Sequence, residues 1–550
     1  MLSSHHDQDS IARAILEKWR NFHASAPAHK LTLRPDADQH STSGRYREMD
    51  LPKYHIPEGS AEGESVYRVI KEELQLDSHP VQNCATFLSG WMEPEAERLI
   101  RDTLSNNLVD QDSNPATQVI HSRCVSMLAD LWHAPKTEEE GGQAVGTSVG
   151  GSSEGIMLAG LAMKWSWREK MKAAGKNTQN PNIIFGANAQ VALEKFGRYF
   201  DVESRLVPVS PESKYCLDPK KALDYVDENT IGIIVILGST YTGHYEPVLE
   251  MSEALDDLQN RTGLDIPIHV DGASGGFVAP FAQPHLKWDF QVPRVHSINT
   301  SGHKFGLCYP GLGWVVWRDG KSLPKGLIFE LHYLGGREFT YTLNFSRPAC
   351  FVIAQYYNLL RLGKEGYKGV MEACLSNAKR MAKNLEASGY FEVLSDVHRP
   401  ALTSSSSSSD GSVAVEGEET EPCLPLVAFT FSKAGRSTEA CTEYALSALL
   451  KTCGWVVPAY ELPKDASNIK VLRVVVRDAM SADIVERLVT DILWATSVLQ
   501  ESKSGDGQIL SDAVARASER HDDHISRNMQ AFFNKQQNGA HKQVTFSAPC

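Results

Sequence analysis

The chain has 550 residues, of which 42% are hydrophobic and 22% are charged. This composition allows a large packed core and excludes a disordered chain, a collagen and a small disulfide scaffold. Acidic residues outnumber basic ones by 68 to 55 and give a net charge of -13, so a nucleic-acid partner is not expected.

The N-terminal residues predict a helical arm. Apolar residues recur at helical spacing over 11–20 and 65–75, which predicts two helices within an arm formed by residues 1–81. The opening MLSSHHDQDS is polar, unlike a secretory signal or a transit peptide, and no apolar run approaches the ~20 residues that span a bilayer. The ten cysteines form no CxxC pair, so neither a metal site nor a disulfide framework is expected. We expect a cytoplasmic protein with reduced thiols and no membrane partner.

The middle of the chain alternates strand-like and helical patterns. Strands are predicted at 182–185, 231–237, 266–270 and 313–317, separated by longer helical segments. This alternation predicts an α/β domain over residues 82–365, with a mainly parallel sheet covered by helices on both faces. A predicted helix at 354–361 closes this domain.

The pattern changes after residue 366. Helices over 370–387 and 438–451, with strands near 426–431 and 470–476, predict a smaller α+β domain at 366–500. Six consecutive serines mark a disordered surface insertion at about 402–422, for which phosphorylation is an alternative. Residues 501–550 form a polar tail with too little basic charge for a calmodulin-binding helix, so calmodulin is not an expected partner.

Three local features point to one cofactor. The small residues of Gly146–Glu154 lead into a helical pattern and offer an anion site, or else an ordinary helix cap. Asp271 ends a predicted buried strand, where ligands of α/β sheets collect, although it could instead cap the next helix. Lys304 lies among small and apolar residues, where desolvation lowers an amine pKa; the alternative is a surface lysine. Together they meet the needs of pyridoxal phosphate: a phosphate cradle, an acid for the ring nitrogen and a lysine for the aldehyde.

At these residues the chain resembles the pyridoxal-dependent glutamate decarboxylases of fold-type I. The segments that carry the resemblance are ATFLSGW, DLWHAP, GQAVGTSVGGSSEGIMLAGLAMKW, DENTIGIIVILGSTYTGHYE, HVDGASGGFVAPF, SINTSGHKFGLCYPGLGWVVWRD and NFSRPA. They extend over residues 66–476. The lysine follows Ser-Gly-His, as in glutamate decarboxylases, and not the Asn-Pro-His of aromatic amino-acid decarboxylases or the Thr-His of sphingosine-phosphate lyases.

The resemblance implies how pyridoxal phosphate is bound. Lys304 would form the Schiff base and Asp271 would keep the ring nitrogen protonated. The other expected cofactor contacts are Ala273 and Gln190 on the two ring faces, Thr240 near the ring hydroxyl, and Ser152, Ser153, Ser301 and His303 at the phosphate. Ser346 would reach the phosphate of the neighbouring subunit. A homo-oligomer with shared active sites is therefore implied.

The resemblance also implies how a small amino-acid substrate is bound. Arg473 would hold the α-carboxylate by a bidentate ion pair. Thr86 and Phe87, with Asp110 from the other subunit, would surround the distal carboxyl. A shared proton between that carboxyl and Asp110 would favour binding at mildly acidic pH. Tyr333 would cover the site and help to protonate the product.

The expected reaction is decarboxylation of L-glutamate at the α-carboxylate to 4-aminobutanoate and carbon dioxide. The alternatives are a decarboxylase of aspartate or cysteine sulfinate, a non-catalytic homologue that retains the fold, and an aminotransferase. The sequence departs from the family pattern at two positions and in one segment: Gly272 replaces an alanine, Leu193 replaces an aromatic residue, and residues 337–339 differ. His541 is not assigned to the histidine that closes the site in some bacterial members.

Overall fold

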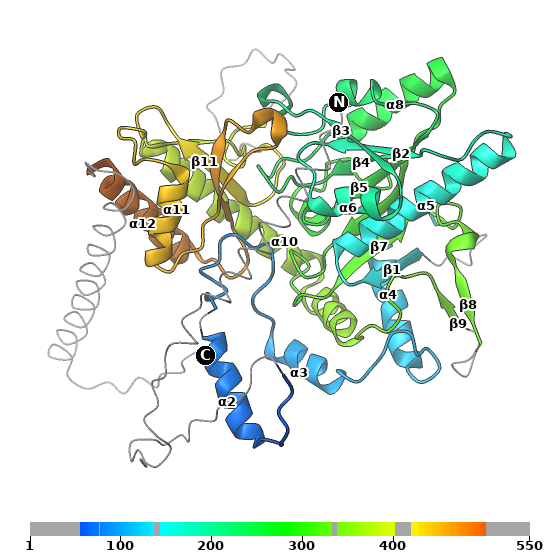
Figure 1. The fold of residues 1–550 in the computed structure, drawn as a ribbon, viewed down its shortest axis with the longest axis horizontal. Helices are drawn as coiled ribbons and strands as arrows, with labels where there is room; N and C mark the ends of the chain where they lie inside the picture. Colours follow the sequence, from blue (N-terminus) through cyan, green and yellow to red (C-terminus); the bar gives the residue numbers. More distant parts are fainter. Residues whose placement is uncertain (1–54, 76, 137–143, 333–337, 402–419, 502–550) are drawn as a thin grey trace. The chain divides into compact units, whose positions relative to one another are not determined.

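A computed structural model describes residues 55–75, 77–136, 144–332, 338–401 and 420–501 (Figure 1). The predicted helix at 11–20, Tyr333, the serine-rich insertion and the tail with His541 lie outside this part. The chain divides into two compact units, one up to Asp77 and the other from Ser78. The described helix of the first unit is α2 (Gly63–Leu74), which confirms the helix predicted over 65–75.

A seven-stranded sheet forms the centre of the second unit. Its strand order is β1-β7-β6-β5-β4-β2-β3. The strands are β1 (Val145–Val149), β2 (Asn182–Gly186), β3 (Glu203–Val207), β4 (Thr230–Ile236), β5 (Ile268–Asp271), β6 (Val295–Thr300) and β7 (Gly313–Trp317). Strand β7 runs antiparallel to both of its neighbours, and the other pairs are parallel. The predicted mainly parallel α/β sheet is confirmed.

Helices cover both faces of this sheet, because its central strands are apolar on both sides. The helices are α3 (Pro94–Asp102), α4 (Pro115–Leu131), α5 (Ser152–Ala173), α6 (Val191–Tyr199), α7 (Pro219–Leu223), α8 (Val248–Thr262) and α9 (Ala279–Ala282). Ile183 and Phe185 of β2 belong to one buried cluster with Phe196 of α6. Ile184, between them, belongs to the cluster on the opposite face, with Leu255 of α8.

A second, four-stranded sheet is formed by residues that follow the first sheet along the chain. It packs on α10 (Cys350–Ala387). Its order is β10-β11-β13-β12, and every pair is antiparallel. The elements are β10 (Phe391–Val393), β11 (Leu426–Phe431), β12 (Ala459–Glu461), β13 (Lys470–Val475), α11 (Glu443–Thr452) and α12 (Ala482–Glu501), and a separate hairpin pairs β8 (Phe329–Leu331) with β9 (Glu338–Thr340). The predicted smaller α+β part is therefore present.

Three predicted boundaries were wrong. Part of the expected loop at Gly146–Glu154 is strand β1, whose Gly146 lies so close to β7 that an added Cβ would be 2.7 Å from Val315 O. The helix predicted over 438–451 begins at Glu443, because Thr442 Oγ1 caps it by accepting from Ala445 N at 3.2 Å. The helices predicted at 354–361 and 370–387 are the two parts of α10 and meet at Gly363, whose φ of 58° and ψ of -169° are not helical, but both parts extend closer to this kink than predicted.

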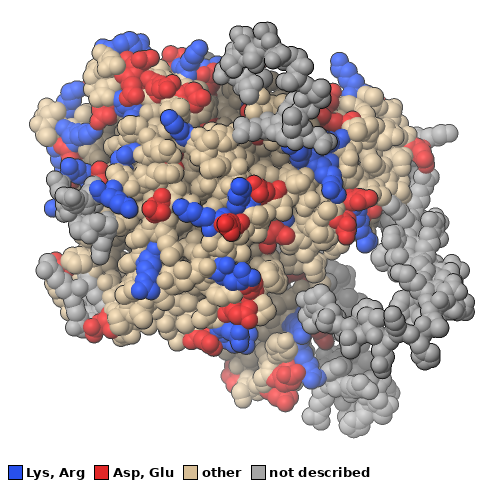
Figure 2. All heavy atoms as spheres, turned by 180° about the vertical axis from the view of Figure 1, so that it is seen from behind, with Lys and Arg blue, Asp and Glu red and all other residues tan. Residues whose placement is uncertain are grey.

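The described residues contain no helix long and apolar enough to cross a bilayer. The nine cysteines in these ranges are free thiols. Within the same ranges, no group of three His, Cys, Asp or Glu side chains could hold a metal ion. On the face drawn in Figure 2, basic side chains are interspersed with acidic ones.

Candidate active site

A cavity of about 510 Å³ opens where the parallel strands β2, β4, β5 and β6 end. Ligands of open α/β sheets bind at this edge. The sequence-predicted residues in its wall are Ser152, Ser153, Gln190, Thr240, Asp271, Ala273, Ser301, His303 and Lys304. A larger, mainly apolar cavity of about 610 Å³ beside α10 contains none of them. We take the first cavity as the candidate site because it gathers the titratable and anion-binding groups.

Lys304 lies in the turn that follows β6 and carries a perturbed amine. Its Nζ donates a hydrogen bond to Ser274 Oγ at 3.3 Å and lies 5.0 Å from the ring centroid of Phe87. Burial, assisted by the charge of Arg473, lowers the pKa of Lys304 to about 8, although Asp271 acts in the opposite direction. The neutral, nucleophilic form of the amine is therefore accessible near neutral pH.

Asp271 is the last residue of β5 and is only 4% exposed. Its Oδ1 accepts hydrogen bonds from Asn299 Nδ2 at 3.0 Å and from the backbone N of Ala273 at 3.1 Å. Asn299 comes from β6, the neighbouring strand, at the position paired with Asp271. Both bonds require an acceptor at Oδ1 and hold the carboxylate at the cavity wall.

A buried histidine supports this carboxylate from behind. His269 Nε2 lies 2.7 Å from Asn299 Oδ1, and His269 Nδ1 lies 2.8 Å from Ser297 Oγ. Because an amide oxygen can only accept, Nε2 must carry the proton. Burial lowers the pKa of His269 and so favours the neutral ring, although the charge of Asp271 opposes this. The sequence patterns did not identify this His269–Asn299–Asp271 chain.

The start of α5 supplies an anion site at one end of the cavity. Ser152 begins the helix directly after Gly150 and Gly151, and its Oγ lies 2.7 Å from Ser301 Oγ. An added Cβ at Gly151 would be 3.0 Å from His303 Cε1, so the glycine allows the imidazole to approach. Burial and the charge of Lys304 lower the pKa of His303 to about 4. Hydroxyls, free N–H groups and the positive helix end are a favourable set for a phosphate.

Two further wall residues, Glu154 and Asn344, were missed from sequence. Glu154 Oε1 accepts hydrogen bonds from the backbone N of Leu343 at 3.0 Å and of Asn344 at 3.3 Å. Its Oε2 accepts from the backbone N of Gly150 at 2.8 Å. The carboxylate of Glu154 thus joins Leu343 and Asn344, about 190 residues away in sequence, to the anion site. A contact between residues so far apart in sequence leaves no local motif.

Asn188 is another wall residue missed from sequence, and it follows β2. Its Nδ2 donates to Glu246 Oε1 at 2.9 Å. Burial, with the charge of Asp271, raises the pKa of Glu246 to about 7 against the hydrogen bonds that it accepts from Ile236 N and Leu217 N. Among the described residues, Asn188 Oδ1 has no partner although it is buried in the cavity wall.

These groups fit pyridoxal phosphate. The anion site, the amine and the carboxylate lie in one cavity, in the combination that its phosphate, aldehyde and ring nitrogen require. Two buried atoms of the wall, Asn188 Oδ1 and His303 Nδ1, have no partner within the described part of the chain and could bond to a ligand. At Gly272, a Cβ would be 2.9 Å from Asn299 O, so the departure from alanine accompanies a close approach of β5 and β6.

Two of the expected substrate residues lie next to Lys304. Arg473 Cζ is 5.1 Å from the ring centroid of Phe87, on which Lys304 also packs. The guanidinium donates from Nη1 to Thr240 O at 2.9 Å and from Nη2 to Ala85 O at 2.6 Å. Thr86, between Ala85 and Phe87, accepts from the backbone N of Leu88 at 3.1 Å.

Asp110 and Ser346 lie apart from this cavity. Asp110 Oδ1 accepts from the backbone N of Ser113 at 3.2 Å, as in a capped turn. Ser346 is exposed, and its Oγ accepts from Asn107 Nδ2 at 3.3 Å. The sequence-based expectation assigned both residues to the site of a neighbouring subunit, so their role stays a prediction. Tyr333 falls outside the described residues.

Comparison with known proteins agrees with this geometry. The model of the pyridoxal-dependent decarboxylase conserved domain matches residues 57–404. Glutamate decarboxylase of Petunia hybrida is 47% identical over 464 residues, 84% of this chain and 87% of the relative, and that of Saccharomyces cerevisiae is 45% identical over 460 residues, 80% and 78%. The solved structure of Lactobacillus brevis glutamate decarboxylase aligns with TM-score 0.74 and 39% identity over 83% of this chain and 97% of that one. The chain belongs to the pyridoxal-dependent decarboxylase family.

The fold class, the family resemblance and the pyridoxal phosphate cofactor predicted from sequence are thereby confirmed. Among the relatives in this family, those of the plants, of yeast and of a bacterium carry the name glutamate decarboxylase. The name of these relatives gives glutamate as their substrate.

Proposed function

We propose that the chain decarboxylates L-glutamate at the α-carboxylate and releases 4-aminobutanoate and carbon dioxide. The observation that carries the proposal is the single cavity in which Lys304, Asp271 and the anion site at Ser152 meet. The choice of glutamate rests on the names of relatives 43–47% identical to this chain over most of its length. Decarboxylases of aspartate or cysteine sulfinate are not favoured by these relatives.

Pyridoxal phosphate, when bound, supplies an electron-accepting ring that is conjugated with the substrate amine. Lys304 would hold the cofactor aldehyde through its amine, and its lowered pKa favours the neutral form. The carboxylate of Asp271 keeps the ring nitrogen protonated, and the hydrogen bonds from Asn299 and Ala273 fix its orientation. The first turn of α5 holds the phosphate by its N–H groups and hydroxyls.

Arg473 binds the α-carboxylate of the substrate. The backbone oxygens of Thr240 and Ala85 hold its guanidinium beside Phe87, so the cation is placed before substrate arrives. Such preorganisation reduces the entropic cost of orienting the bond that breaks. The orientation of that bond against the ring decides which reaction follows.

The remaining assignments complete the proposal. The enzyme is a homo-oligomer in which Asp110 and Ser346 of one subunit serve the site of the next, and Tyr333 covers the site and assists protonation. Residues 1–81 form an arm, 82–365 the cofactor-binding domain, 366–500 the smaller domain with an insertion at about 402–422, and 501–550 a tail. The protein acts in the cytoplasm without calmodulin.

The test is a product assay with L-glutamate labelled with ¹³C at the α-carboxyl. We expect labelled carbon dioxide and stoichiometric 4-aminobutanoate, with much slower release from aspartate and cysteine sulfinate. Keto acid without carbon dioxide would indicate an aminotransferase instead. A purified protein that binds the cofactor but releases carbon dioxide from none of these acids would support the non-catalytic alternative.

Replacement of the carboxylate-binding arginine should weaken the use of the substrate. In Arg473→Lys, kcat/KM for L-glutamate should fall roughly 30-fold, because a bidentate hydrogen-bonded ion pair becomes a single contact. Because Arg473 Nη1 also donates to Thr240 O, kcat/KM is measured at saturating pyridoxal phosphate, so that a change in cofactor affinity does not enter it. Arg205→Lys, at a surface ion pair with Asp227, is the matched control. Equal losses in the two variants would contradict the role of Arg473.

Assembly of the holoenzyme should depend on pH in a defined direction. Only the neutral amine attacks the aldehyde, so the rate at which apoenzyme reacts with pyridoxal phosphate should rise as pH passes through about 8, the pKa of Lys304. Because the charge of Asp271 raises this pKa, the midpoint in Asp271→Asn should move to lower pH. Stopped-flow absorbance measures both, with N-acetyl-lysine as a reference for titration of the cofactor itself. A midpoint that moves upward in the variant would contradict this electrostatic account.

A further inference from the structure

The loop that follows β4 connects the cofactor cavity with the four-stranded sheet. Gly238 and Thr240 of this loop line the cavity. The loop closes on itself by a hydrogen bond from the backbone N of Ser239 to His244 O at 2.8 Å. The position of Thr240 in the cofactor cavity therefore depends on the contacts that hold the loop residues between Ser239 and His244.

Four consecutive carbonyl oxygens of this loop each accept a hydrogen bond from the four-stranded sheet or from residues that flank its strands. The donors are Arg473 Nη1 to Thr240 O at 2.9 Å, Tyr460 Oη to Tyr241 O at 3.0 Å, Ser395 Oγ to Thr242 O at 2.7 Å and the backbone N of Leu424 to Gly243 O at 2.9 Å. Each donor comes from a different strand or its flank. The second sheet thus fixes the loop residue by residue.

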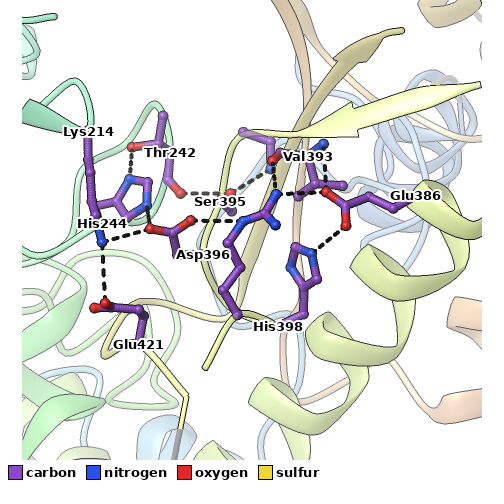
Figure 3. Close-up of polar contacts among 11 residues, drawn as sticks. Lys214, Thr242, His244, Glu386, Val393, Ser395, Asp396, His398 and Glu421 are labelled. Atoms are coloured by element: carbon purple, nitrogen blue, oxygen red, sulfur yellow. Dashed lines mark hydrogen bonds and ion pairs between the residues drawn. The ribbon is translucent and has the colours of Figure 1, made fainter. Parts of the chain in front are cut away.

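Ser395 makes the most buried of these side-chain contacts. The residue is 0% exposed, and its one hydroxyl donates to Thr242 O and accepts from the backbone N of Ala428 at 2.9 Å. In Figure 3 Ser395 lies between Thr242 and the strands of the second sheet. Loss of the hydroxyl would leave two buried backbone groups without their bond, which favours rearrangement of the loop.

Charges next to Ser395 hold the same two segments together. Asp396 Oδ2 lies 2.8 Å from Lys214 Nζ and 3.2 Å from His244 Nε2, and its Oδ1 lies 3.2 Å from Arg399 Nε (Figure 3). Burial opposes the charged form, but His244 and Lys214 hold the pKa of Asp396 well below its usual range. His244 in turn lies 2.9 Å from Thr242 Oγ1 through its Nδ1. The loop is therefore held by the side chain of His244 as well as by its carbonyls.

We propose that Ser395 and Tyr460 are positioning residues for pyridoxal phosphate, because each fixes a carbonyl within two residues of Thr240 while neither lines the cavity. Burial raises the pKa of Tyr460 to about 12, so its hydroxyl keeps the proton that it donates. The proposal rests on the cofactor occupying this cavity and is independent of which amino acid is decarboxylated.

The test measures cofactor binding to the full-length apoenzyme. Ser395→Ala and Tyr460→Phe each remove one hydroxyl, and the second keeps the ring that packs on Arg473. We expect the dissociation constant of pyridoxal phosphate to rise about fivefold in each, and the absorption spectrum of the bound cofactor to shift, as Thr240 loses its fixed place. Titration followed by absorbance, well below the melting temperature of every variant, gives both readouts.

Ser432→Ala is the matched control. Its hydroxyl also joins two backbone groups, in the turns before β10 and after β11 of the same sheet: it donates to Gly389 O at 2.7 Å and accepts from Gly435 N at 3.0 Å, and neither group belongs to the loop. Unchanged cofactor affinity and spectrum in Tyr460→Phe and in folded Ser395→Ala would overturn the positioning role, as would an equal loss in Ser432→Ala. If Ser395→Ala does not fold, Tyr460→Phe decides. A wild-type apoenzyme that binds no pyridoxal phosphate would overturn the cofactor assignment itself.

Discussion

Lys304→Ala should lower turnover of L-glutamate by more than about 1000-fold, because the variant loses both the amine that holds the cofactor and a group that exchanges protons beside it. The side chain lies between Ser274 and the ring of Phe87, so its loss opens space in the cavity, while Asp271 keeps its hydrogen bonds from Asn299 and Ala273. The variant should therefore fold. Release of carbon dioxide under saturating cofactor and substrate is the measurement.

Lys170→Ala provides the comparison for this variant. Lys170 forms an exposed ion pair with Asp265 at 3.0 Å, and such pairs contribute little to stability. Its turnover should match that of the wild type. Turnover in Lys304→Ala within tenfold of the wild type would remove Lys304 from the reaction.

Asp271→Asn should lower kcat by at least about 100-fold, the scale expected when a charge that stabilises the transition state is removed. An asparagine keeps the oxygen that accepts from Asn299 and Ala273, so the local geometry is retained. The second carboxylate oxygen becomes an NH₂ group, which cannot accept a proton from the ring nitrogen. The ring then withdraws electrons less strongly.

For Asp271→Asn, kcat and the affinity for pyridoxal phosphate are measured separately, so that a slower reaction is distinguished from weaker binding of the cofactor. Asp289→Asn is the matched control, since Asp289 is buried, accepts from the backbone N of Gln291 at 2.9 Å and lies away from the cavity. A fall in kcat of the same size in both variants would mean that loss of any buried carboxylate is responsible, and not the position of Asp271.

Hydropathy predicted β2, β4, β5 and β7 and missed β1 and β6, in which small and polar residues interrupt the apolar pattern. Strands β2, β4 and β7 are continuous apolar runs and were found. Strand β6 has the sequence VHSINT, in which Ser297 and Asn299 are buried because they bond to His269 and Asp271. Strand β1 likewise contains Gly146, whose role is close approach to β7. Polar residues at core positions carry no local signal of burial.

The candidate site divides in a similar way. Lys304, Asp271 and the serines of the anion site stand in short motifs that combine residue type with position, so they could be predicted. Glu154 and Asn188 act through partners far away in sequence, which only the folded chain brings together. The expected roles of Asp110 and Ser346 require a second subunit, and a single chain cannot test them.

The most direct test reduces the holoenzyme with borohydride, which fixes the cofactor to whichever amine holds it, and maps the label by peptide mass spectrometry. We predict one pyridoxyl group per chain, attached to Lys304, and no label after the same treatment of Lys304→Ala. A label on any other lysine of the wild type, or none at all, would contradict the assignment.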